Sequence, residues 1–303
     1  MDFEINKKFC ELLGKTGVLT DEPMSSHTTF RIGGPADYFL IPETVEQVGR
    51  IIEICREASL PYFILGNGSN LLVGDRGYRG VIIQLYRNMS DVRTEGTVIR
   101  AQAGALLSAV AAAARNASLT GFEFAGGIPG TVGGAVVMNA GAYGGEMKDV
   151  LTEAVVLTDK GEIRTLSVEE LQLGYRTSIV KTAGYIVLEA KFRLEEGDQA
   201  RIRETMKELT LKRTSKQPLE FPSAGSTFKR PEGYFAGKLV MDSGLAGYQV
   251  GGAQVSAKHC GFVINAGGAT ARDVRMLMKD VQDKVFEKYG VKLEPEVKFL
   301  GEF

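Results

Sequence analysis

The sequence predicts an α+β fold that is divided into several compact units. Stretches near residues 44–58 and 270–289 carry an apolar stripe at helical spacing, whereas short apolar runs elsewhere indicate strands. Two of these runs, at 154–158 and 162–166, are joined by a short Asp-Lys-Gly turn, which is a β-hairpin signal. The chain has 303 residues and a hydrophobic content of 44%, which is enough for two or three domains with a substantial core.

The first predicted unit, residues 1–88, contains one helix and several strands. Thr44 and Gln47 form a capping box at the start of the helix 44–58. A glycine turn at 66–70 interrupts an apolar stretch, so we expect a strand on each side of it. The apolar face of the helix consists of Val45, Val48, Ile52 and Cys55. The expected strands are 61–65, 71–73 and 81–85.

The second predicted unit, residues 89–205, contains the hairpin and a long glycine-rich segment. A run of four alanines within 104–117 is typical of a helix that is buried on several sides. Apolar and charged residues alternate through 188–194, which predicts a half-buried strand. Further elements are a strand at 97–103 and a helical stretch at 199–212.

The third predicted unit, residues 206–303, begins near a polar, proline-bearing segment at 213–222 that we interpret as a boundary or binding loop. Its helix begins at Thr270, which forms a capping box with Asp273, and ends at Tyr289 and Gly290. A final strand is expected at 293–300, with Leu293, Val297 and Phe299 on one face. The segment 293–303 is expected to pack back on the first unit.

Composition limits the classes of function. The formal net charge of −1 argues against a protein that neutralises nucleic-acid phosphates. Cys10, Cys55 and Cys260 form no CxxC pair, and His27 and His259 stand apart in the sequence from each other and from any carboxylate cluster, so no disulfide framework or metal site is predicted. The sequence shows neither a signal peptide nor a run approaching about 18 apolar residues. We therefore predict a soluble, cytoplasmic protein without a nucleic-acid or membrane partner.

Two glycine-rich segments are candidates for ligand binding. The turn at 66–70 (GNGSN) follows a strand but matches neither a P-loop nor a GxGxxG fingerprint, so a phosphate-binding loop and a plain turn remain equally consistent with it. The tract at 121–145 holds nine glycines in 25 residues and a single charged residue, Glu123. A buried connection remains an alternative there. Its nearly uncharged character, with Thr131 and Asn139 as hydrogen-bonding side chains, favours a large flat cofactor with a diphosphate tail.

Seven ordered motifs, from about residue 25 to the C-terminus, resemble the UDP-N-acetylenolpyruvoylglucosamine reductase family. A chance match of this order and number is not credible, and the length of the chain resembles the shorter form of the family, which lacks an extra folded insert and a tyrosine-bearing loop. The motifs are TFRIGGP at 29–35, LGNGSNLLV at 65–73, GIPGTVGG at 127–134, NAGAYG at 139–144, YR at 175–176, GS at 225–226 and LEPEV at 293–297.

The resemblance implies a fold, a cofactor and a set of site residues. The fold is an FAD-binding domain of the vanillyl-alcohol-oxidase-like type in two subdomains, followed by a C-terminal α+β substrate-binding domain. FAD is implied to bind non-covalently, with NADPH as its reductant. Implied FAD contacts are Gly66, Asn67, Gly68, Ser69, Asn70, Gly127, Ile128, Pro129, Gly130, Thr131, Gly133, Gly134, Asn139, Ala140 and Gly141. Implied substrate contacts are Tyr175, Lys216 and Arg230.

Arg176, Ser226 and Glu296 match the catalytic residues of the family, although on the sequence alone Ser226 is more typical of a structural turn and Arg176 of an ion-pairing surface residue. The implied reaction reduces the enolpyruvyl group of UDP-N-acetylglucosamine enolpyruvate to UDP-N-acetylmuramate, a precursor of bacterial peptidoglycan. Arg176 and Glu296 would stabilise the developing enolate, with Glu296 protonated or paired with a cation. Ser226 would then donate a proton to the carbon next to the carboxylate.

Two alternatives remain beside this reductase. One is an FAD-dependent oxidase of the same superfamily, which the absence of histidine from both glycine segments disfavours because many such oxidases bind flavin through histidine. The other is a non-catalytic protein that binds a nucleotide sugar. We expect the reductase to be a monomer.

Overall fold

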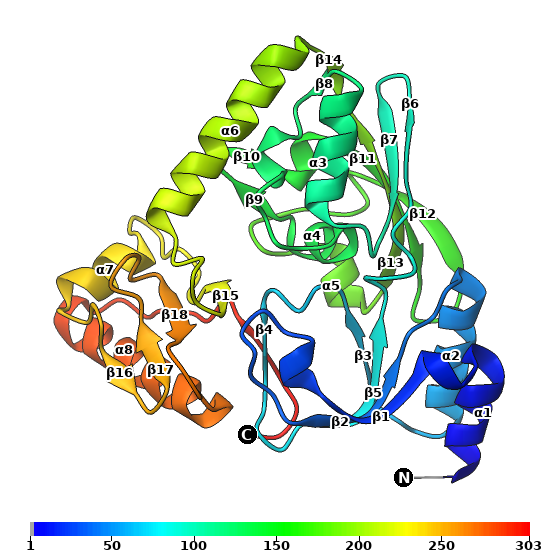
Figure 1. Ribbon diagram of the computed structural model, residues 1–303, viewed down its shortest axis with the longest axis horizontal. Coiled ribbons are helices and arrows are strands. Elements are labelled where there is room, and N and C mark those ends of the chain that lie inside the picture. The colour runs from blue at the N-terminus through cyan, green and yellow to red at the C-terminus, as the bar shows by residue number, and fades with distance from the viewer. Residues whose placement is uncertain (1–2) are drawn as a thin grey trace. The chain divides into compact units, whose positions relative to one another are not determined.

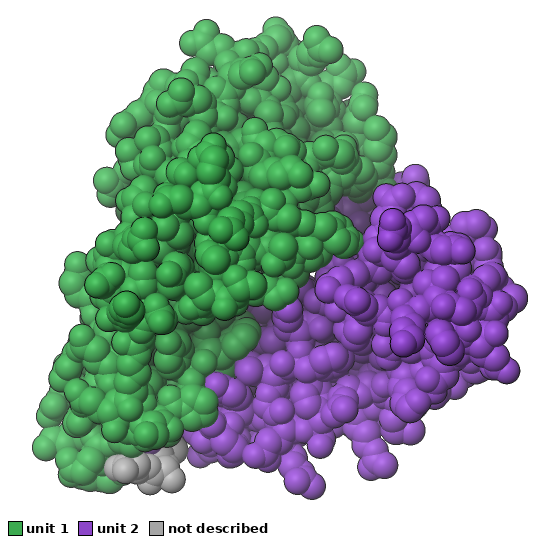
Figure 2. Space-filling model, turned by 180° about the vertical axis from the view of Figure 1, so that it is seen from behind, with its two compact units in different colours: residues 1–19, 39–67, 81–212 green, residues 20–38, 68–80, 213–303 purple. Residues whose placement is uncertain are grey.

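The protein, described by a computed structural model over residues 3–303, divides into two compact units (Figure 2). Unit 1 comprises Met1–Leu19, of which residues 3–19 are described, together with Phe39–Asn67 and Val81–Lys212. Unit 2 comprises Thr20–Tyr38, Gly68–Gly80 and Arg213–Phe303. The chain therefore passes between the units several times. The boundaries do not coincide with those expected at residues 88 and 205, and the three-unit division stays a prediction.

Unit 1 begins with helix α1 (Phe3–Leu13), which packs against helix α2 (Val45–Glu57). Thr44 caps α2 by accepting a hydrogen bond from the Gln47 backbone N–H, which confirms the predicted start of this helix. Strand β3 (Tyr62–Leu65) pairs in parallel with β5 (Tyr78–Gln84), and both strands agree with the sequence prediction. Along the chain, β1 (Val18–Pro23), β2 (Pro35–Leu40) and β5 each cross from one unit to the other.

The larger sheet of unit 1 is antiparallel and has the strand order β12-β11-β13-β7-β6 (Figure 1). Helices α3 (Leu107–Asn116) and α4 (Val132–Met138) pack against it. The predicted hairpin is confirmed as the β11–β12 pair, and the alternating strand as β13. The strands are β6 (Val92–Glu95), β7 (Val98–Gln102), β11 (Leu151–Leu157), β12 (Ile163–Ser167) and β13 (Ile186–Arg193).

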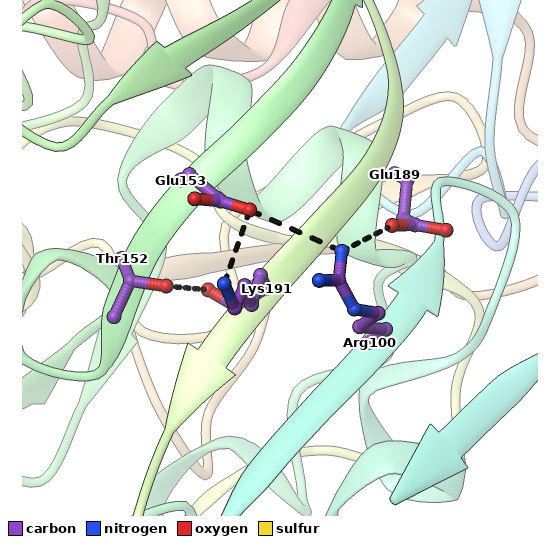
Figure 3. Close-up of polar contacts among 5 residues, drawn as sticks. All are labelled: Arg100, Thr152, Glu153, Glu189 and Lys191. Atoms are coloured by element: carbon purple, nitrogen blue, oxygen red, sulfur yellow. Dashed lines mark hydrogen bonds and ion pairs between the residues drawn. The ribbon is translucent and has the colours of Figure 1, made fainter. Parts of the chain in front are cut away.

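One face of this sheet carries a network of opposite charges (Figure 3). Lys191 Nζ lies 3.3 Å from Glu153 Oε1, and Arg100 Nη1 lies 3.5 Å from Glu189 Oε1 and 3.9 Å from Glu153 Oε1. Thr152 Oγ1 donates to the Lys191 carbonyl over 3.0 Å. These side chains are partly exposed, and such ion pairs contribute about 0–1 kcal/mol each, so we interpret this face as a solvated surface rather than a reactive site.

Helix α6 (Gln199–Lys216) extends four residues further than predicted. The segment 213–216 is helical, so the expectation of a loop over all of 213–222 is wrong at its start. The helix stops before Pro218 because a proline disfavours the helical conformation of the residue that precedes it. Unit 1 also contains α5 (Ile179–Ala183) and two short strand pairs, β8 (Leu119–Thr120) with β14 (Glu195–Glu196) and β9 (Gly141–Ala142) with β10 (Gly145–Glu146).

Unit 2 is built on a four-stranded antiparallel sheet that helix α8 (Ala271–Tyr289) covers. The predicted capping box of Thr270 and Asp273 and the predicted end of α8 at Tyr289 and Gly290 are both confirmed, and Gly290 adopts the left-handed conformation with φ +68°. The buried stripe of α8 consists of Val274, Leu277, Met278, Val281 and Val285. The other elements are β15 (Ser223–Ser226), α7 (Ala236–Asp242), β16 (Gln249–Val250), β17 (Ala253–Val255) and β18 (Phe262–Asn265).

The C-terminal segment of unit 2 is less regular than predicted. Strand β19 covers only Lys298–Leu300 and pairs in parallel with β4 (Leu71–Val73), a segment of the first 88 residues. Pro295 lacks a backbone N–H and so cannot extend a strand ladder, which limits the strand expected over 293–300. Phe299 is 43% exposed rather than buried with Leu293 and Val297, so its predicted face is wrong.

Close backbone contacts hold this part of unit 2 together. A Cβ atom at Gly74 would overlap the backbone of Glu302, and one at Gly34 would overlap the backbone of Asp75. The second glycine of the TFRIGGP motif therefore serves packing. Four single-turn 3₁₀ helices complete the part of the chain that the structure describes, at Lys15–Gly17, Met24–Ser26, Glu123–Ala125 and Met147–Asp149. Within residues 3–303, no helix combines the length and the apolar character needed to cross a bilayer.

Two glycine-to-alanine substitutions should have opposite effects on stability. Gly74→Ala forces a Cβ against backbone, so we expect it to lower the free energy of unfolding by about 1–3 kcal/mol. Gly49 lies inside α2, and nothing lies within 4 Å of a Cβ added there. Because alanine favours a helix more than glycine does, Gly49→Ala should raise the free energy of unfolding by about 0.5–1 kcal/mol. Urea unfolding measures both values, and equal midpoints for Gly74→Ala and wild type would contradict the packing argument.

Candidate functional site

The two glycine-rich segments meet within unit 1. Asn67 Nδ2 donates a hydrogen bond of 2.8 Å to the Pro129 carbonyl. Gly66 lies against Thr131 so closely that a Cβ at Gly66 would overlap the Thr131 hydroxyl. The absence of a side chain at Gly66 therefore lets the end of strand β3 reach the second segment.

The second glycine segment is held by the preceding turn. The N–H groups of Val132 and Gly133 donate to the carbonyls of Ala105 and Ala103, each over 2.8 Å. A Cβ at Gly133 would lie 3.0 Å from the Ala103 Cβ, so Gly133 serves internal packing. Gly127, Pro129 and Gly134, in contrast, are exposed, and a Cβ at Gly134 would meet only Thr131 Oγ1 at 3.7 Å.

The rest of the first segment lies in unit 2. Gly68 has φ +61°, and a Cβ there would overlap the His27 carbonyl. Asn70 Nδ2 donates to the Glu296 carbonyl over 3.2 Å, and the Lys298 N–H donates to the Asn70 carbonyl over 3.0 Å. The side chain of Asn70 thus holds the segment that carries Glu296.

Ser226 and Glu296 lie on neighbouring segments of unit 2. The Glu296 N–H donates to the Thr227 carbonyl over 2.9 Å, and Phe228 bridges to Pro295. Strand β15 contains an irregularity between Ser223 and Ser226, with one more residue than its partner β18 and Gly225 at φ +76°. Such β-bulges re-aim side chains, and Ser226 at the end of this one is exposed.

Arg176 lies in unit 1 at a tight two-residue turn. The backbone groups of Gly174 and Thr177 hydrogen-bond to each other in both directions, at 3.1 and 3.2 Å. Arg176 has φ +57°, a left-handed conformation that costs a non-glycine residue about 1–2 kcal/mol. Its guanidinium carbon lies 5.1 Å from the centroid of the Tyr175 ring. A charged side chain kept at a position that favours glycine is a candidate functional residue.

The structure uses Asn139 differently from the expected cofactor contact of its side chain. Asn139 is 1% exposed and caps the end of α4 with φ +41°, and its side chain makes three hydrogen bonds inside the protein. Its Nδ2 donates to Glu146 Oε2 over 2.7 Å and to the Gly174 carbonyl over 3.2 Å, and its Oδ1 accepts from the Lys148 N–H over 3.0 Å. Sequence reasoning missed Glu146, for which the only signal was a Glu-x-x-Asp capping pattern with Asp149.

Comparison with known proteins decides the family. A model of the FAD binding domain matches residues 36–167, and a model of the UDP-N-acetylenolpyruvoylglucosamine reductase C-terminal domain matches residues 217–300. The UDP-N-acetylenolpyruvoylglucosamine reductases of Agathobacter rectalis and Alkaliphilus oremlandii are 58% and 54% identical to this chain, covering 98% of it and 98% and 97% of their own lengths. The chain belongs to the UDP-N-acetylenolpyruvoylglucosamine reductase family.

A solved member of this reductase family has the same fold. The crystal structure of the enzyme from Thermus caldophilus matches with a TM-score of 0.81 and 37% sequence identity, over 93% of this chain and 98% of that chain. The predicted α+β fold, with an FAD-binding domain and a C-terminal reductase domain, is confirmed. The chain is a flavin-dependent oxidoreductase, so the non-catalytic alternative is set aside.

The glycine segments fit the FAD that this reductase family implies. Gly127 and Gly134 expose backbone without a Cβ, and a Cβ at Gly134 would make only an ordinary contact with Thr131 Oγ1 at 3.7 Å, so there is room beside it. The exposed part of the tract near Pro129 is uncharged, as a flat, largely apolar ring system requires. The residues that would hold FAD in unit 1 are therefore those around Gly66, Asn67 and residues 127–134.

The expected substrate contacts Lys216 and Arg230 both belong to unit 2. Lys216 is the last residue of α6. Arg230 Cζ lies 4.0 Å from the Phe235 ring centroid, and its Nε donates to the Tyr234 carbonyl over 3.3 Å. Phe235 is 60% exposed, so this stacked pair offers both a cation and an apolar ring at the surface of unit 2.

The two histidines have structural roles within unit 2. His27 Nε2 lies 2.7 Å from Glu22 Oε1. His259 Nδ1 accepts from the Gly261 N–H over 3.1 Å, and burial, with a smaller effect of Lys216, holds the pKa of His259 below its ordinary value. Among the described residues, no group of three or more His, Cys, Asp or Glu side chains could hold a metal ion.

The left-handed backbone of Arg176 predicts which substitutions at this position destabilise the protein more. Arg176→Gly and Arg176→Ala both remove the guanidinium, but only glycine adopts positive φ without strain, so Arg176→Gly should be more stable than Arg176→Ala by about 1 kcal/mol. At Thr177, whose φ is not positive, the order should reverse. Thermal unfolding of the four variants measures these differences in stability. If Arg176→Ala were as stable as Arg176→Gly, the backbone of Arg176 would not be strained.

Proposed function

We propose that this chain reduces the enolpyruvyl group of UDP-N-acetylglucosamine enolpyruvate to UDP-N-acetylmuramate, with NADPH as the reductant of its FAD. The observation that carries the proposal is Arg176, a permanent cation held in a strained and hydrogen-bonded turn. We infer the substrate from the names of the relatives of this chain, which are UDP-N-acetylenolpyruvoylglucosamine reductases. When bound and reduced, FAD supplies the hydride.

Arg176 would bind the carboxylate of the enolpyruvyl group. An alkene conjugated to a carboxylate accepts hydride only if the negative charge that flows toward the carboxylate is stabilised as it forms. A guanidinium offers two parallel N–H donors to a carboxylate and stays charged at any physiological pH. A fixed turn keeps this charge in place before the reaction, so no reorganisation is needed when the enolate develops.

Ser226 and Glu296 would complete the reaction. After hydride addition, the carbon next to the carboxylate needs a proton, and the hydroxyl of Ser226 is a sufficient acid because an enolate is a strong base. Glu296 would stabilise the enolate while protonated or paired with a cation, since a bare carboxylate would repel it. Support comes from the backbone hydrogen bond between Glu296 and Thr227, the residue after Ser226, which keeps the two side chains on neighbouring segments.

The remaining assignments follow from this proposal. Gly66–Asn70 and 127–134 would hold the FAD, with Asn139, Ala140 and Gly141 contributing through their backbone. Tyr175, Lys216 and Arg230 would contact the sugar nucleotide. NADPH would reduce the flavin before the sugar nucleotide enters. The product is a peptidoglycan precursor, and we place the enzyme in the cytoplasm as a monomer.

Flavin colour tests the proposed function directly. The purified protein should be yellow, should be bleached anaerobically by NADPH, and should recover its colour when the enolpyruvyl substrate is added. In Ser226→Ala, bleaching should be unchanged, whereas recolouring by the substrate should slow by about 10²–10⁴-fold because the proton donor is missing. Ser223→Ala, on the same strand, is the matched control. Recolouring of Ser226→Ala at the wild-type rate would remove Ser226 from the mechanism.

Arg176 variants should separate the two half-reactions in the same assay. Arg176→Ala should keep its flavin and be bleached by NADPH, but recolouring should slow by about 10²-fold or more because the enolate loses its cation. Loss of flavin from the purified variant would instead assign Arg176 a structural role.

A further inference from the structure

Asn139 lies beneath the turn that carries Arg176. We infer that Asn139, supported by Glu146, is a positioning residue that holds Arg176 in its strained conformation. The inference rests on the catalytic role of Arg176 proposed above. It assigns Asn139 a function other than binding cofactor through its side chain, which is buried and whose two polar atoms are both hydrogen-bonded within the protein.

Only one orientation of the Asn139 amide satisfies its surroundings. The Lys148 N–H is a donor and requires an oxygen, whereas Glu146 Oε2 and the Gly174 carbonyl are acceptors and require the NH₂ group. Glu146 is itself fixed, because its carboxylate accepts from the Asp149 N–H and lies 3.3 Å from Lys148 Nζ. The second N–H of Asn139 is thereby directed at Gly174.

The Gly174 carbonyl is the point at which Asn139 controls the turn. It accepts from both the Thr177 N–H and Asn139 Nδ2. Gly174 and Thr177, which flank Tyr175 and Arg176, are therefore held by hydrogen bonds. A second tie follows directly, since Ser178 Oγ donates to the Val137 carbonyl over 2.9 Å. Both ties lead to the last residues of α4 and its cap.

The hydrogen bonds from Asn139 to Gly174 and from Ser178 to Val137 are needed because of the backbone conformation of Arg176. A positive φ is unfavourable for arginine, so a turn released from its ties relaxes toward conformations in which the guanidinium points elsewhere. Asn139 itself adopts φ +41°, which asparagine tolerates better than most residues. Helix α4 begins at Val132, within the glycine segment 127–134, and is capped by Asn139, so one short helix connects the proposed FAD segment with the Arg176 turn.

Asn139→Gly tests the inference. Glycine keeps the positive φ and removes the side chain with its amide. We expect FAD retention and bleaching by NADPH to be unchanged, and recolouring by the enolpyruvyl substrate to slow by about 10–10²-fold, as expected when a catalytic group is displaced by about 1 Å. Gln199→Ala is the matched control, because Gln199 Nε2 donates to the Arg115 carbonyl over the same 3.2 Å elsewhere in unit 1, and it should recolour at the wild-type rate.

A double-mutant cycle distinguishes positioning from general destabilisation. If Asn139 acts through Arg176, Asn139→Gly should add no further slowing to recolouring in an Arg176→Ala background. The inference would be overturned if the slowing factors of the two single variants multiplied in the double variant, or if a folded Asn139→Gly protein lost its FAD.

Hydrogen–deuterium exchange provides a readout that does not depend on the proposed reaction. Amides of the turn 174–178 should exchange faster in Asn139→Gly but not in Gln199→Ala, because the turn has lost a tie. Unchanged exchange would refute the inference. If wild-type reduced protein were not recoloured by the substrate, the proposed function would fail while this measurement would still decide whether Asn139 holds the turn.

A second variant covers the case in which Asn139→Gly does not fold. In Asn139→Asp/Glu146→Gln, the new glutamine can donate to the new aspartate, so the pair survives with its polarity reversed, but ionised aspartate has no N–H for Gly174. We expect a folded protein with faster exchange at 174–178 and slow recolouring. Wild-type behaviour in both measurements would show that the Gly174 contact does not position Arg176.

Discussion

Close approach between backbone segments is the constraint on which much of this structure depends. In unit 2, the C-terminal residues reach β4 only because Gly74 has no side chain, and in unit 1 the Gly66 turn reaches Thr131 for the same reason. Within the tract 121–145, Gly133 and Gly145 lie too close to Ala103 and Phe124 to gain a Cβ without displacing a neighbour. Many of these glycines are therefore required for packing, and only the exposed glycines are available to contact a ligand.

Side-chain amides of three asparagines add hydrogen bonds to the close backbone contacts that the glycines allow. Asn67 donates to Pro129, Asn70 to Glu296 and Asn139 to Gly174, so each asparagine links a glycine-rich segment to a backbone carbonyl elsewhere in its own unit. Two of these carbonyls belong to segments that carry proposed catalytic residues. The asparagines that resembled ligand contacts thus couple the segments proposed to hold the cofactor with those proposed to carry out the chemistry.

Local features of the fold could be predicted from the sequence, and non-local ones could not. The capping box at Thr270 and the β11–β12 hairpin depend on neighbouring residues and were found. The exposure of Phe299 and the passage of the chain between two units depend on distant segments, which periodicity does not encode. Likewise, the sequence motif indicated that Asn139 matters, but not that its amide points inward to Gly174 rather than toward a ligand.

The proposed catalytic residues are fixed by two different backbone devices. A guanidinium acts as a permanent charge, so its contribution depends on where that charge lies, and a strained turn held from outside restricts its position. A serine hydroxyl acts as an acid only along the direction of its O–H bond, so its contribution depends on aim, which the bulge at Gly225 sets. Both devices rely on positive φ. At Gly225 glycine adopts it freely, whereas at position 176 the proposed reaction requires arginine, so the surrounding hydrogen bonds must offset the strain.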